Sequence, residues 1–217
     1  MKKITAKEAF SIPNILSYFR ILLVPVFVWA YYSAVTAQSN FYYIVAAVVI
    51  GVSGLTDFLD GQIARRCNMI TEWGKFIDPV ADKLTQGALV ICMAVLRYPL
   101  MWILVGLFVL KEGFLSVAGI VLLRNGKKLN GALWYGKICT ATFYACVLIL
   151  LVFTKIDELA ANVIILVCGS LMAFALVMYA NVYSKIWHDL KHPDEPKKLT
   201  GEKMVTDIPR EEMPREK

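Results

Sequence analysis

Residues 41–60 read FYYIVAAVVIGVSGLTDFLD, an apolar run that ends in two aspartates, Asp57 and Asp60. A helix needs about 20 mostly apolar residues to cross the hydrocarbon core of a bilayer, and residues 41–59 come close to that length. Charged side chains within a membrane usually face the interior of a helix bundle or a water-filled cavity. The stretch therefore predicts a membrane helix that carries acidic groups at one end.

Five more apolar runs of similar length lie on either side of this stretch. They cover residues 12–35, 76–96, 100–123, 133–153 and 160–186, and a polar stretch, 60–71, ends the run quoted above. From residue 188 onward the chain is polar, with prolines at 193, 196, 209 and 214, as expected of a flexible tail. We therefore expect an all-α integral membrane protein with six transmembrane helices in residues 1–187 and a polar tail in residues 188–217.

The composition also favours a lipid-embedded chain. Of the 217 residues, 58% are hydrophobic and 18% are charged, whereas about a quarter of the residues in a soluble domain are charged. The mean hydropathy is +0.59. Six spans leave no room for a separate soluble catalytic domain, so that any chemistry must be carried by the membrane helices.

Lysine and arginine gather in alternate connections, which fits a membrane protein better than the nucleic-acid binding that a net charge of +6 would otherwise suggest. The positive connections contain Lys2, Lys3 and Lys7; Arg65, Arg66 and Lys75; Arg124, Lys127, Lys128 and Lys137; and Lys185, Lys191, Lys197 and Lys198. The opposite side carries Arg97 and Lys155. Positively charged loops remain in the cytoplasm. We therefore expect both termini, and the tail, on the cytoplasmic side of the cell's inner membrane.

Two pairs of aspartates stand at the facing ends of spans two and three. Asp57 and Asp60 are three residues apart, and Asp78 and Asp82 are four apart, so that each pair shares one helix face. Because the two spans are consecutive and antiparallel, the pairs should meet near the cytoplasmic surface. Close carboxylates repel one another unless cations are present, and an all-oxygen ligand set suits Mg²⁺ or Mn²⁺.

Small residues accompany these acids. Gly61 and Ala64 continue the face of Asp57 and Asp60, and Gly74 precedes Asp78 by four residues. Glycine allows a ligand or a neighbouring backbone to approach closely, and the forked guanidinium of Arg65 suits a phosphate group. The cluster indicates a two-metal site that grips a phosphate-containing lipid or nucleotide. The alternative is a set of solvated helix-end charges in which Asp60 pairs with Arg65 or Arg66.

The stretch from Asp57 to Asp82 resembles the signature of the CDP-alcohol phosphotransferases, D-x2-D-G-x2-A-R-x8-G-x3-D-x3-D, with all eight fixed positions present. The six-span layout is also that of this family. The resemblance implies transfer of a phosphatidyl or related group from a CDP-linked lipid to an alcohol, with release of CMP. It also implies that the protein is a homodimer and that CDP-diacylglycerol enters the site from the bilayer.

The resemblance assigns roles to the signature residues. It implies that Asp57, Asp60 and Asp78 are metal ligands, and that Asp82 completes the shell of a second ion and takes the proton of the acceptor hydroxyl. It further implies that the CDP group lies against the residues Asp57, Gly61, Ala64, Arg65 and Gly74.

The acceptor has to be sought in other motifs. The segment from Pro13 to Arg20 resembles the P-N-x-[LI]-[ST]-x-x-R start of bacterial phosphatidylglycerophosphate synthases and of the related cardiolipin synthases, which makes Asn14, Ser17 and Arg20 candidate acceptor or phosphate contacts. An anionic acceptor such as sn-glycerol 3-phosphate needs cations, for which Arg124 and Lys137 are candidates. Lys111-Glu112 departs from the Arg-Glu that is usual in the glycerophosphate enzymes, and could equally be a structural pair.

Other functions remain open at this point. Within the family, a cardiolipin synthase would use phosphatidylglycerol as the acceptor, and further relatives use inositol or inositol phosphate. From another class, a divalent metal-ion transporter could use membrane carboxylates, although its acids would be expected near the midplane and on several spans. Here they cluster at one surface.

Overall fold

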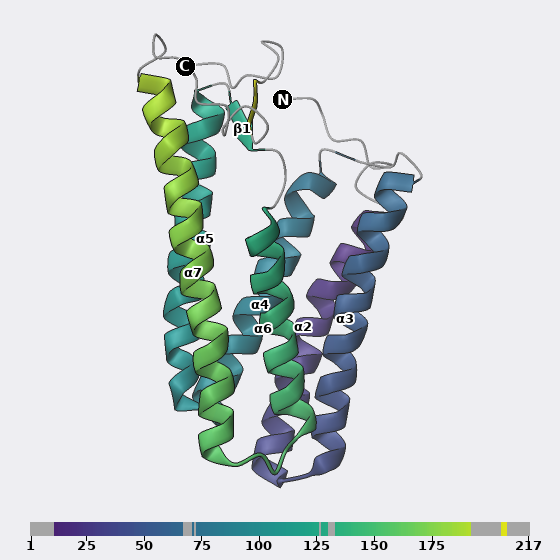
Figure 1. The fold of residues 1–217 in the computed structure, drawn as a ribbon. Coiled ribbons are helices and arrows are strands. Elements are labelled where there is room, and N and C mark those ends of the chain that lie inside the picture. The colour runs from purple at the N-terminus through teal and green to yellow at the C-terminus, as the bar shows by residue number, and fades with distance from the viewer. Residues whose placement is uncertain are drawn as a thin grey trace. The chain divides into compact units, whose positions relative to one another are not determined.

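The computed structural model describes residues 11–66, 71, 73–125, 127–129, 133–191 and 205–207, of which residues 61, 64, 65, 75, 127–129, 189–191 and 205–207 are described by their backbone alone. Long helices dominate the described chain (Figure 1). They are α2 (Ile12–Ala37), α3 (Asn40–Arg66), α4 (Gly74–Leu96), α5 (Trp102–Arg124), α6 (Trp134–Val152) and α7 (Glu158–Lys191), with a short 3-10 helix, η1 (Pro99–Met101), before α5.

Within the described residues, six helices are long and apolar enough to cross a membrane, as the sequence predicts. Each predicted apolar run falls on one of them, apart from a residue or two at an end. The second apolar span ends at Asp60, as the sequence predicts, and helix α3 itself continues to Arg66. Glutamine, alanine and arginine are good helix formers, so that the polar residues after Asp60 extend the helix beyond the apolar segment.

By its internal contacts the chain divides into two units, residues 1–105 with 145–162, and residues 106–144 with 163–217. In the first unit α2 packs against both α3 and α4. The turn from α2 to α3 is made by Gln38, whose backbone is left-handed (φ 49°) and whose N–H caps the carbonyl of Ala34. This tight reversal places α3 antiparallel to α2 (Figure 1).

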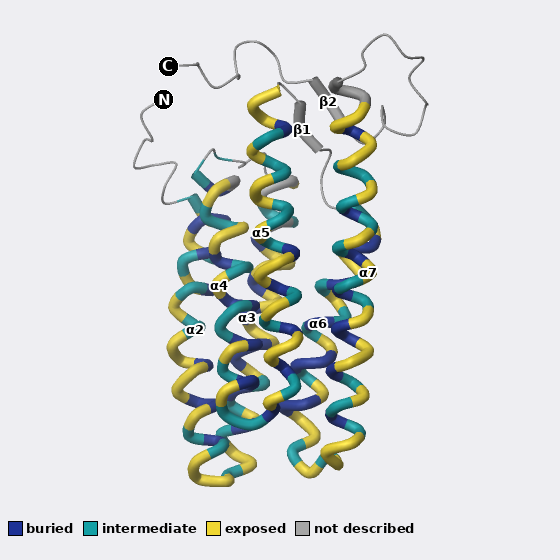
Figure 2. Tube along the Cα trace, turned by 90° about the vertical axis from the view of Figure 1, so that its left-hand side faces the viewer, coloured by how far each residue is buried: buried dark blue, intermediate teal, exposed yellow. Residues whose placement is uncertain are grey.

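Helix α2 buries three polar residues and leaves large apolar residues exposed. Asn14, Ser17 and Arg20 are at most 1% exposed, whereas Leu22 is 66% exposed and Trp29 57%. Exposed residues also occur along the length of the other helices (Figure 2). This pattern is the reverse of that in a soluble helix and fits a protein whose outer surface faces lipid and whose polar groups must find partners inside.

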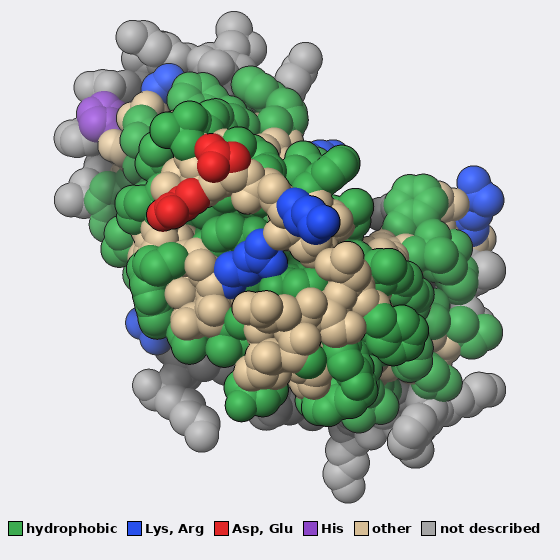
Figure 3. All heavy atoms as spheres, turned by 90° about the horizontal axis from the view of Figure 1, so that it is seen from below, with side chains coloured by type: hydrophobic (Ala, Val, Ile, Leu, Met, Phe, Trp, Pro, Cys, Tyr) green, Lys and Arg blue, Asp and Glu red, His purple; other side chains and the backbone are tan. Residues whose placement is uncertain are grey.

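Arg97 joins three segments of the first unit at the end away from the aspartates. Its guanidinium donates to the hydroxyl of Tyr43 at 2.5 Å and to the carbonyl of Thr154, and lies 5.2 Å and 5.3 Å from the ring centres of Tyr43 and Tyr98. Seen from below, hydrophobic side chains cover much of the protein and charged ones are few (Figure 3). By its hydrogen bonds Arg97 ties α3 to the connection that follows α6.

In the second unit, aromatic side chains join α6 to α7 and α5 to α7. The rings of Tyr135 and Tyr179 are 4.7 Å apart, and those of Phe114 and Tyr183 are 5.8 Å apart. Lys111 is 5% exposed and its Nζ lies 2.8 Å from Oε1 of Glu112, so that this pair is an ion pair within α5.

The expected tail contains some regular structure. Helix α7 ends at Lys191 rather than before residue 188. Farther on, β2 (Val205–Asp207) pairs antiparallel with β1 (Lys127–Leu129), and Lys128 lies opposite Thr206. The remainder of residues 192–217 lies outside the described residues.

Candidate active site

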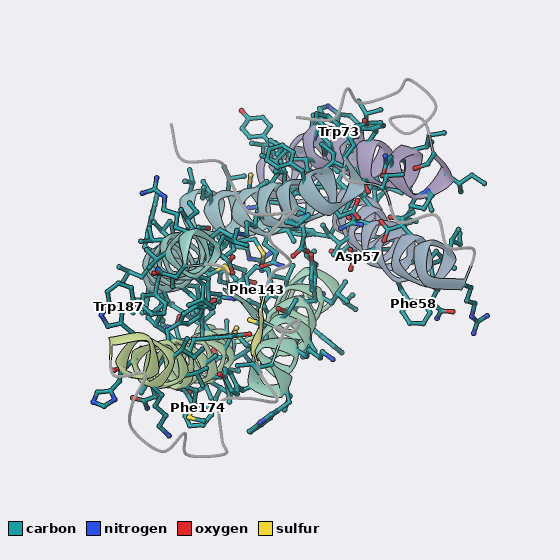
Figure 4. All side chains as sticks on the ribbon, turned by 90° about the horizontal axis from the view of Figure 1, so that it is seen from above. Asp57, Phe58, Trp73, Phe143, Phe174 and Trp187 are labelled. Atoms are coloured by element: carbon teal, nitrogen blue, oxygen red, sulfur yellow. The ribbon has the colours of Figure 1, made fainter. Side chains whose placement is uncertain are left out.

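The four aspartates lie where the sequence predicts, on the last turns of α3 and the first turns of α4, both in the first unit. Figure 4 looks onto these helix ends from above and shows that Asp57 and its neighbour Phe58 leave α3 on different sides. Asp60 is buried at 5% exposure, whereas the side chain of Asp57 is 54% exposed. One carboxylate of the α3 pair is therefore held inside the protein and the other is accessible.

Arg20 of α2 bridges the α3 pair. Its Nη1 lies 2.5 Å from Oδ1 of Asp57, and its Nη2 donates to Oδ2 of Asp60. The arginine itself is 1% exposed. The guanidinium fork thus contacts one oxygen on each carboxylate and offsets their mutual repulsion. Asp60 thus pairs with an arginine of α2, whereas the side chain of Arg65, one of the alternative partners, lies outside the described residues.

The α4 pair is held from two directions. Ser17 of α2, which is fully buried, has its hydroxyl 2.5 Å from Oδ1 of Asp78. Asp82 accepts hydrogen bonds from Nε2 of Gln86 at 3.0 Å on each of its two oxygens. Gln86 is 5% exposed. Serine and glutamine donors of this kind orient a carboxylate without neutralising it.

The connection into α4 is also fastened to α2. Asn14 donates from Nδ2 to Oγ1 of Thr71 at 3.2 Å, and the same oxygen accepts from the backbone N–H of Gly74 at 2.9 Å. The indole N–H of Trp73 donates to the hydroxyl of Tyr18. One polar face of α2 therefore contacts the α3 pair, the connection and Asp78 of the α4 pair.

Gly74 has a packing reason to be glycine. A Cβ there would lie 2.7 Å from Oδ1 of Asn14, closer than real Cβ atoms approach other atoms, and 3.0 Å from Oγ1 of Thr71, which is a tight contact. The helix backbone passes through Gly61, Ala64 and Arg65, but their side chains lie outside the described part of the chain. Their role against a CDP group stays a prediction.

The candidate acceptor residues fall into two groups. Asn14, Ser17 and Arg20 come together with the aspartates or the connection into α4, through contacts that the sequence did not suggest. Arg124 and Lys137 are exposed residues of the second unit, at the end of α5 and the start of α6. Gln86 was missed by the sequence analysis, although its position four residues after Asp82 on one helix was a usable signal.

In the described parts of the chain, no three His, Cys, Asp or Glu side chains converge closely enough to enclose an ion. The donor set is nevertheless of the right chemistry, because the four carboxylates of the last turns of α3 and the first turns of α4 supply only oxygen. Arginine, serine and glutamine partners occupy part of that oxygen set. The residues fit hard divalent cations by ligand type.

Comparison with known proteins identifies the class. The family model described as CDP-alcohol phosphatidyltransferase matches residues 10–187, and the chain belongs to that family. A protein of Haemophilus influenzae, named CDP-diacylglycerol–glycerol-3-phosphate 3-phosphatidyltransferase, is 28% identical over 177 residues, which are 80% of this chain and 93% of that protein. Proteins of the same name from Escherichia coli K12 and Shigella flexneri are 35% identical over 134 residues, 60% of this chain and 71% of theirs.

Proposed function

We propose that this chain transfers the phosphatidyl group of CDP-diacylglycerol to sn-glycerol 3-phosphate, giving phosphatidylglycerol phosphate and CMP. The observation that carries the proposal is that one face of α2 contacts three of the four signature aspartates, Asp57 and Asp60 of α3 and Asp78 of α4. The names of the relatives from three bacteria support the choice of acceptor.

The proposed reaction uses Asp82 as the base. The acceptor hydroxyl oxygen attacks the phosphorus that bears diacylglycerol, the P–O bond to CMP breaks, and the hydroxyl proton passes to Asp82. Gln86 donates to both oxygens of Asp82, which restricts the rotation of the carboxylate. A positioned base of this kind typically contributes about 10²–10⁴-fold to the rate.

Asp57, Asp60, Asp78 and Asp82 would hold two ions of Mg²⁺ or Mn²⁺. When bound, such ions would offset the charge of the pyrophosphate and of the attacking and leaving oxygens. The residues of this chain prepare the site: Arg20 and Ser17 keep three of the four carboxylates in place. The CDP group would lie beside Asp57 and Gly74, against the α3 residues Gly61, Ala64 and Arg65.

The setting of the reaction is part of the proposal. The distribution of lysine and arginine supports both termini and the site on the cytoplasmic side of the inner membrane. The water-soluble acceptor would then arrive from the cytoplasm, with Arg124 and Lys137 as candidate contacts for its phosphate. We also expect a homodimer, which light scattering of the purified protein would detect.

An acceptor screen tests the function. Purified protein with CDP-diacylglycerol and Mg²⁺ or Mn²⁺ is offered sn-glycerol 3-phosphate, phosphatidylglycerol or inositol phosphate in parallel. We expect CMP release and a lipid product with sn-glycerol 3-phosphate. Cardiolipin formed from phosphatidylglycerol would indicate the related synthase instead, and Mg²⁺ or Mn²⁺ flux into liposomes without CMP release would indicate a transporter.

A further inference from the structure

We propose that Arg20 is a positioning residue that sets the geometry of the metal ligands: it bridges Asp57 and Asp60 and, together with Ser17 on the same face of α2, holds the carboxylates of α3 and α4 in register. The inference rests on the proposed function, because it presumes that the aspartates bind divalent cations. It gives Arg20 a role other than the acceptor contact that its motif suggests.

The first support is the burial of Arg20. A guanidinium that is 1% exposed, on a helix that is otherwise apolar on its outside, is expensive to place in a membrane unless it is paired. Its partners are two carboxylates rather than one, and both belong to the signature. A single ion pair for stability would need only one of them.

The second support is that the two terminal nitrogens of the Arg20 guanidinium contact different carboxylates. Nη1 contacts Oδ1 of Asp57, and Nη2 contacts Oδ2 of Asp60. Each carboxylate therefore uses one oxygen for the arginine, which leaves its second oxygen outside this ion pair. Partners that hold one atom of a ligating group orient the other, and their loss typically weakens metal binding about 10–100-fold.

The third support is the position of Ser17, three residues before Arg20 and so on the same helix face. Its hydroxyl lies 2.5 Å from Oδ1 of Asp78 on α4. One face of α2 thus holds two ligands of α3 and one of α4. Residues of a single helix therefore contact three of the four signature carboxylates, on both α3 and α4.

The test is the binding of Mn²⁺ to the full-length purified protein without any lipid or acceptor, followed by the electron paramagnetic resonance signal of free Mn²⁺. The variants are Arg20→Gln, Arg20→Lys and the matched control Arg97→Gln. Arg97 is also a multiply bonded arginine of the first unit, but it contacts Tyr43 and Thr154 and none of the aspartates.

We expect Arg20→Gln to weaken Mn²⁺ binding about 10–100-fold. Arg20→Lys should also weaken it, because one ammonium group cannot reproduce the fork that spans two carboxylates. Arg97→Gln should lower the melting temperature and leave Mn²⁺ affinity unchanged. Unchanged or tighter Mn²⁺ binding by Arg20→Gln, or wild-type affinity in Arg20→Lys, would overturn the positioning role.

Two further outcomes are separable. Should Arg20→Gln fail to fold, Ser17→Ala removes a single hydroxyl and must still weaken Mn²⁺ binding, so that unchanged affinity in that variant would overturn the inference. If the unaltered protein bound no Mn²⁺, this result would contradict both the role of the metal in the proposed function and the positioning role of Arg20. A changed KM for sn-glycerol 3-phosphate with normal Mn²⁺ affinity in Arg20→Gln would indicate that Arg20 contacts the acceptor instead, and would overturn the positioning role.

Discussion

Gln86 donates from one amide nitrogen to both carboxylate oxygens of Asp82, each at 3.0 Å, across one turn of α4. The pair is local, so that it does not depend on the packing of other helices. Gln86 is nearly inaccessible at 5% exposure and cannot easily adopt another position. The proposed base is therefore held by a neutral partner that restricts its rotation.

Replacement of Gln86 by Leu should lower kcat. A hydrogen bond to a charged group contributes about 1.5–3 kcal/mol, and each 1.4 kcal/mol of barrier corresponds to about tenfold in rate. We expect a loss of at least about tenfold in CMP release, with little change in KM for CDP-diacylglycerol. Thr36→Val, at the other end of α2, removes a hydroxyl bonded to the Tyr32 carbonyl and is the control. Equal kcat in the two variants would refute the role of Gln86.

Asp82→Asn should abolish turnover while binding of CDP-diacylglycerol is largely retained. The amide is close in shape to the carboxylate but cannot take the proton of the acceptor hydroxyl. Calorimetric binding and CMP release measure the two effects separately. Asp157→Asn, in the connection before α7, is the control and should keep normal activity. CMP release near the wild-type rate in Asp82→Asn would show that Asp82 is not the base.

Gly74→Ala should destabilise the protein, because the new Cβ would lie 2.7 Å from Oδ1 of Asn14. Overpacking of this kind costs about 1–3 kcal/mol, which for a chain of this size lowers the melting temperature by about 2–4 °C per kcal/mol. Thermal unfolding in detergent measures the change. Gly51→Ala in α3 is the matched control, since a Cβ there meets nothing within 4 Å. Equal melting temperatures would contradict the packing argument.

Gly136→Ala tests the second close approach of a glycine. A Cβ at Gly136 would lie 2.2 Å from the hydroxyl oxygen of Tyr179 and 3.1 Å from the ring carbon that bears it. We expect a lower melting temperature, and a partial recovery when Gly136→Ala is combined with Tyr179→Phe, which removes the closest atom. No recovery in the double variant would place the cause of the destabilisation elsewhere.

Removal of divalent cations should stop the reaction. A chelator is expected to abolish CMP release, and added Mg²⁺ or Mn²⁺ to restore it, because the acidic ligands offer only oxygen and favour hard ions. Ca²⁺, which is larger and takes more ligands, is the comparison ion and should restore less. CMP release that persists in excess chelator would exclude the metal from the proposed function.

Much of the fold was predictable because a membrane span requires a long apolar run, and each run stands out from its connections. The residue at which α3 ends was not predictable, because amino-acid composition does not indicate where a helix stops once it has left the apolar region. The pairing of Asp57 with Asp60, and of Asp78 with Asp82, followed from helical spacing alone. Gln86 was open to the same argument.

The contacts of α2 with the site could not be predicted. Arg20 precedes Asp60 by 40 residues, and Ser17 precedes Asp78 by 61. Such contacts depend on how α2 packs against α3 and α4 after the reversal at Gln38, which a spacing pattern does not contain. The motif around Arg20 indicated that its polar face was important, but only the packing shows that the face meets the aspartates.

The central claim is the transfer of the phosphatidyl group to sn-glycerol 3-phosphate. The most direct measurement is the mass of the lipid formed by the purified protein from CDP-diacylglycerol and isotopically labelled sn-glycerol 3-phosphate with Mg²⁺ or Mn²⁺. We predict phosphatidylglycerol phosphate that carries the label, formed in equal amount to CMP. A labelled acceptor that stays unreacted while another alcohol is converted, or the absence of CMP with every acceptor, would contradict the claim.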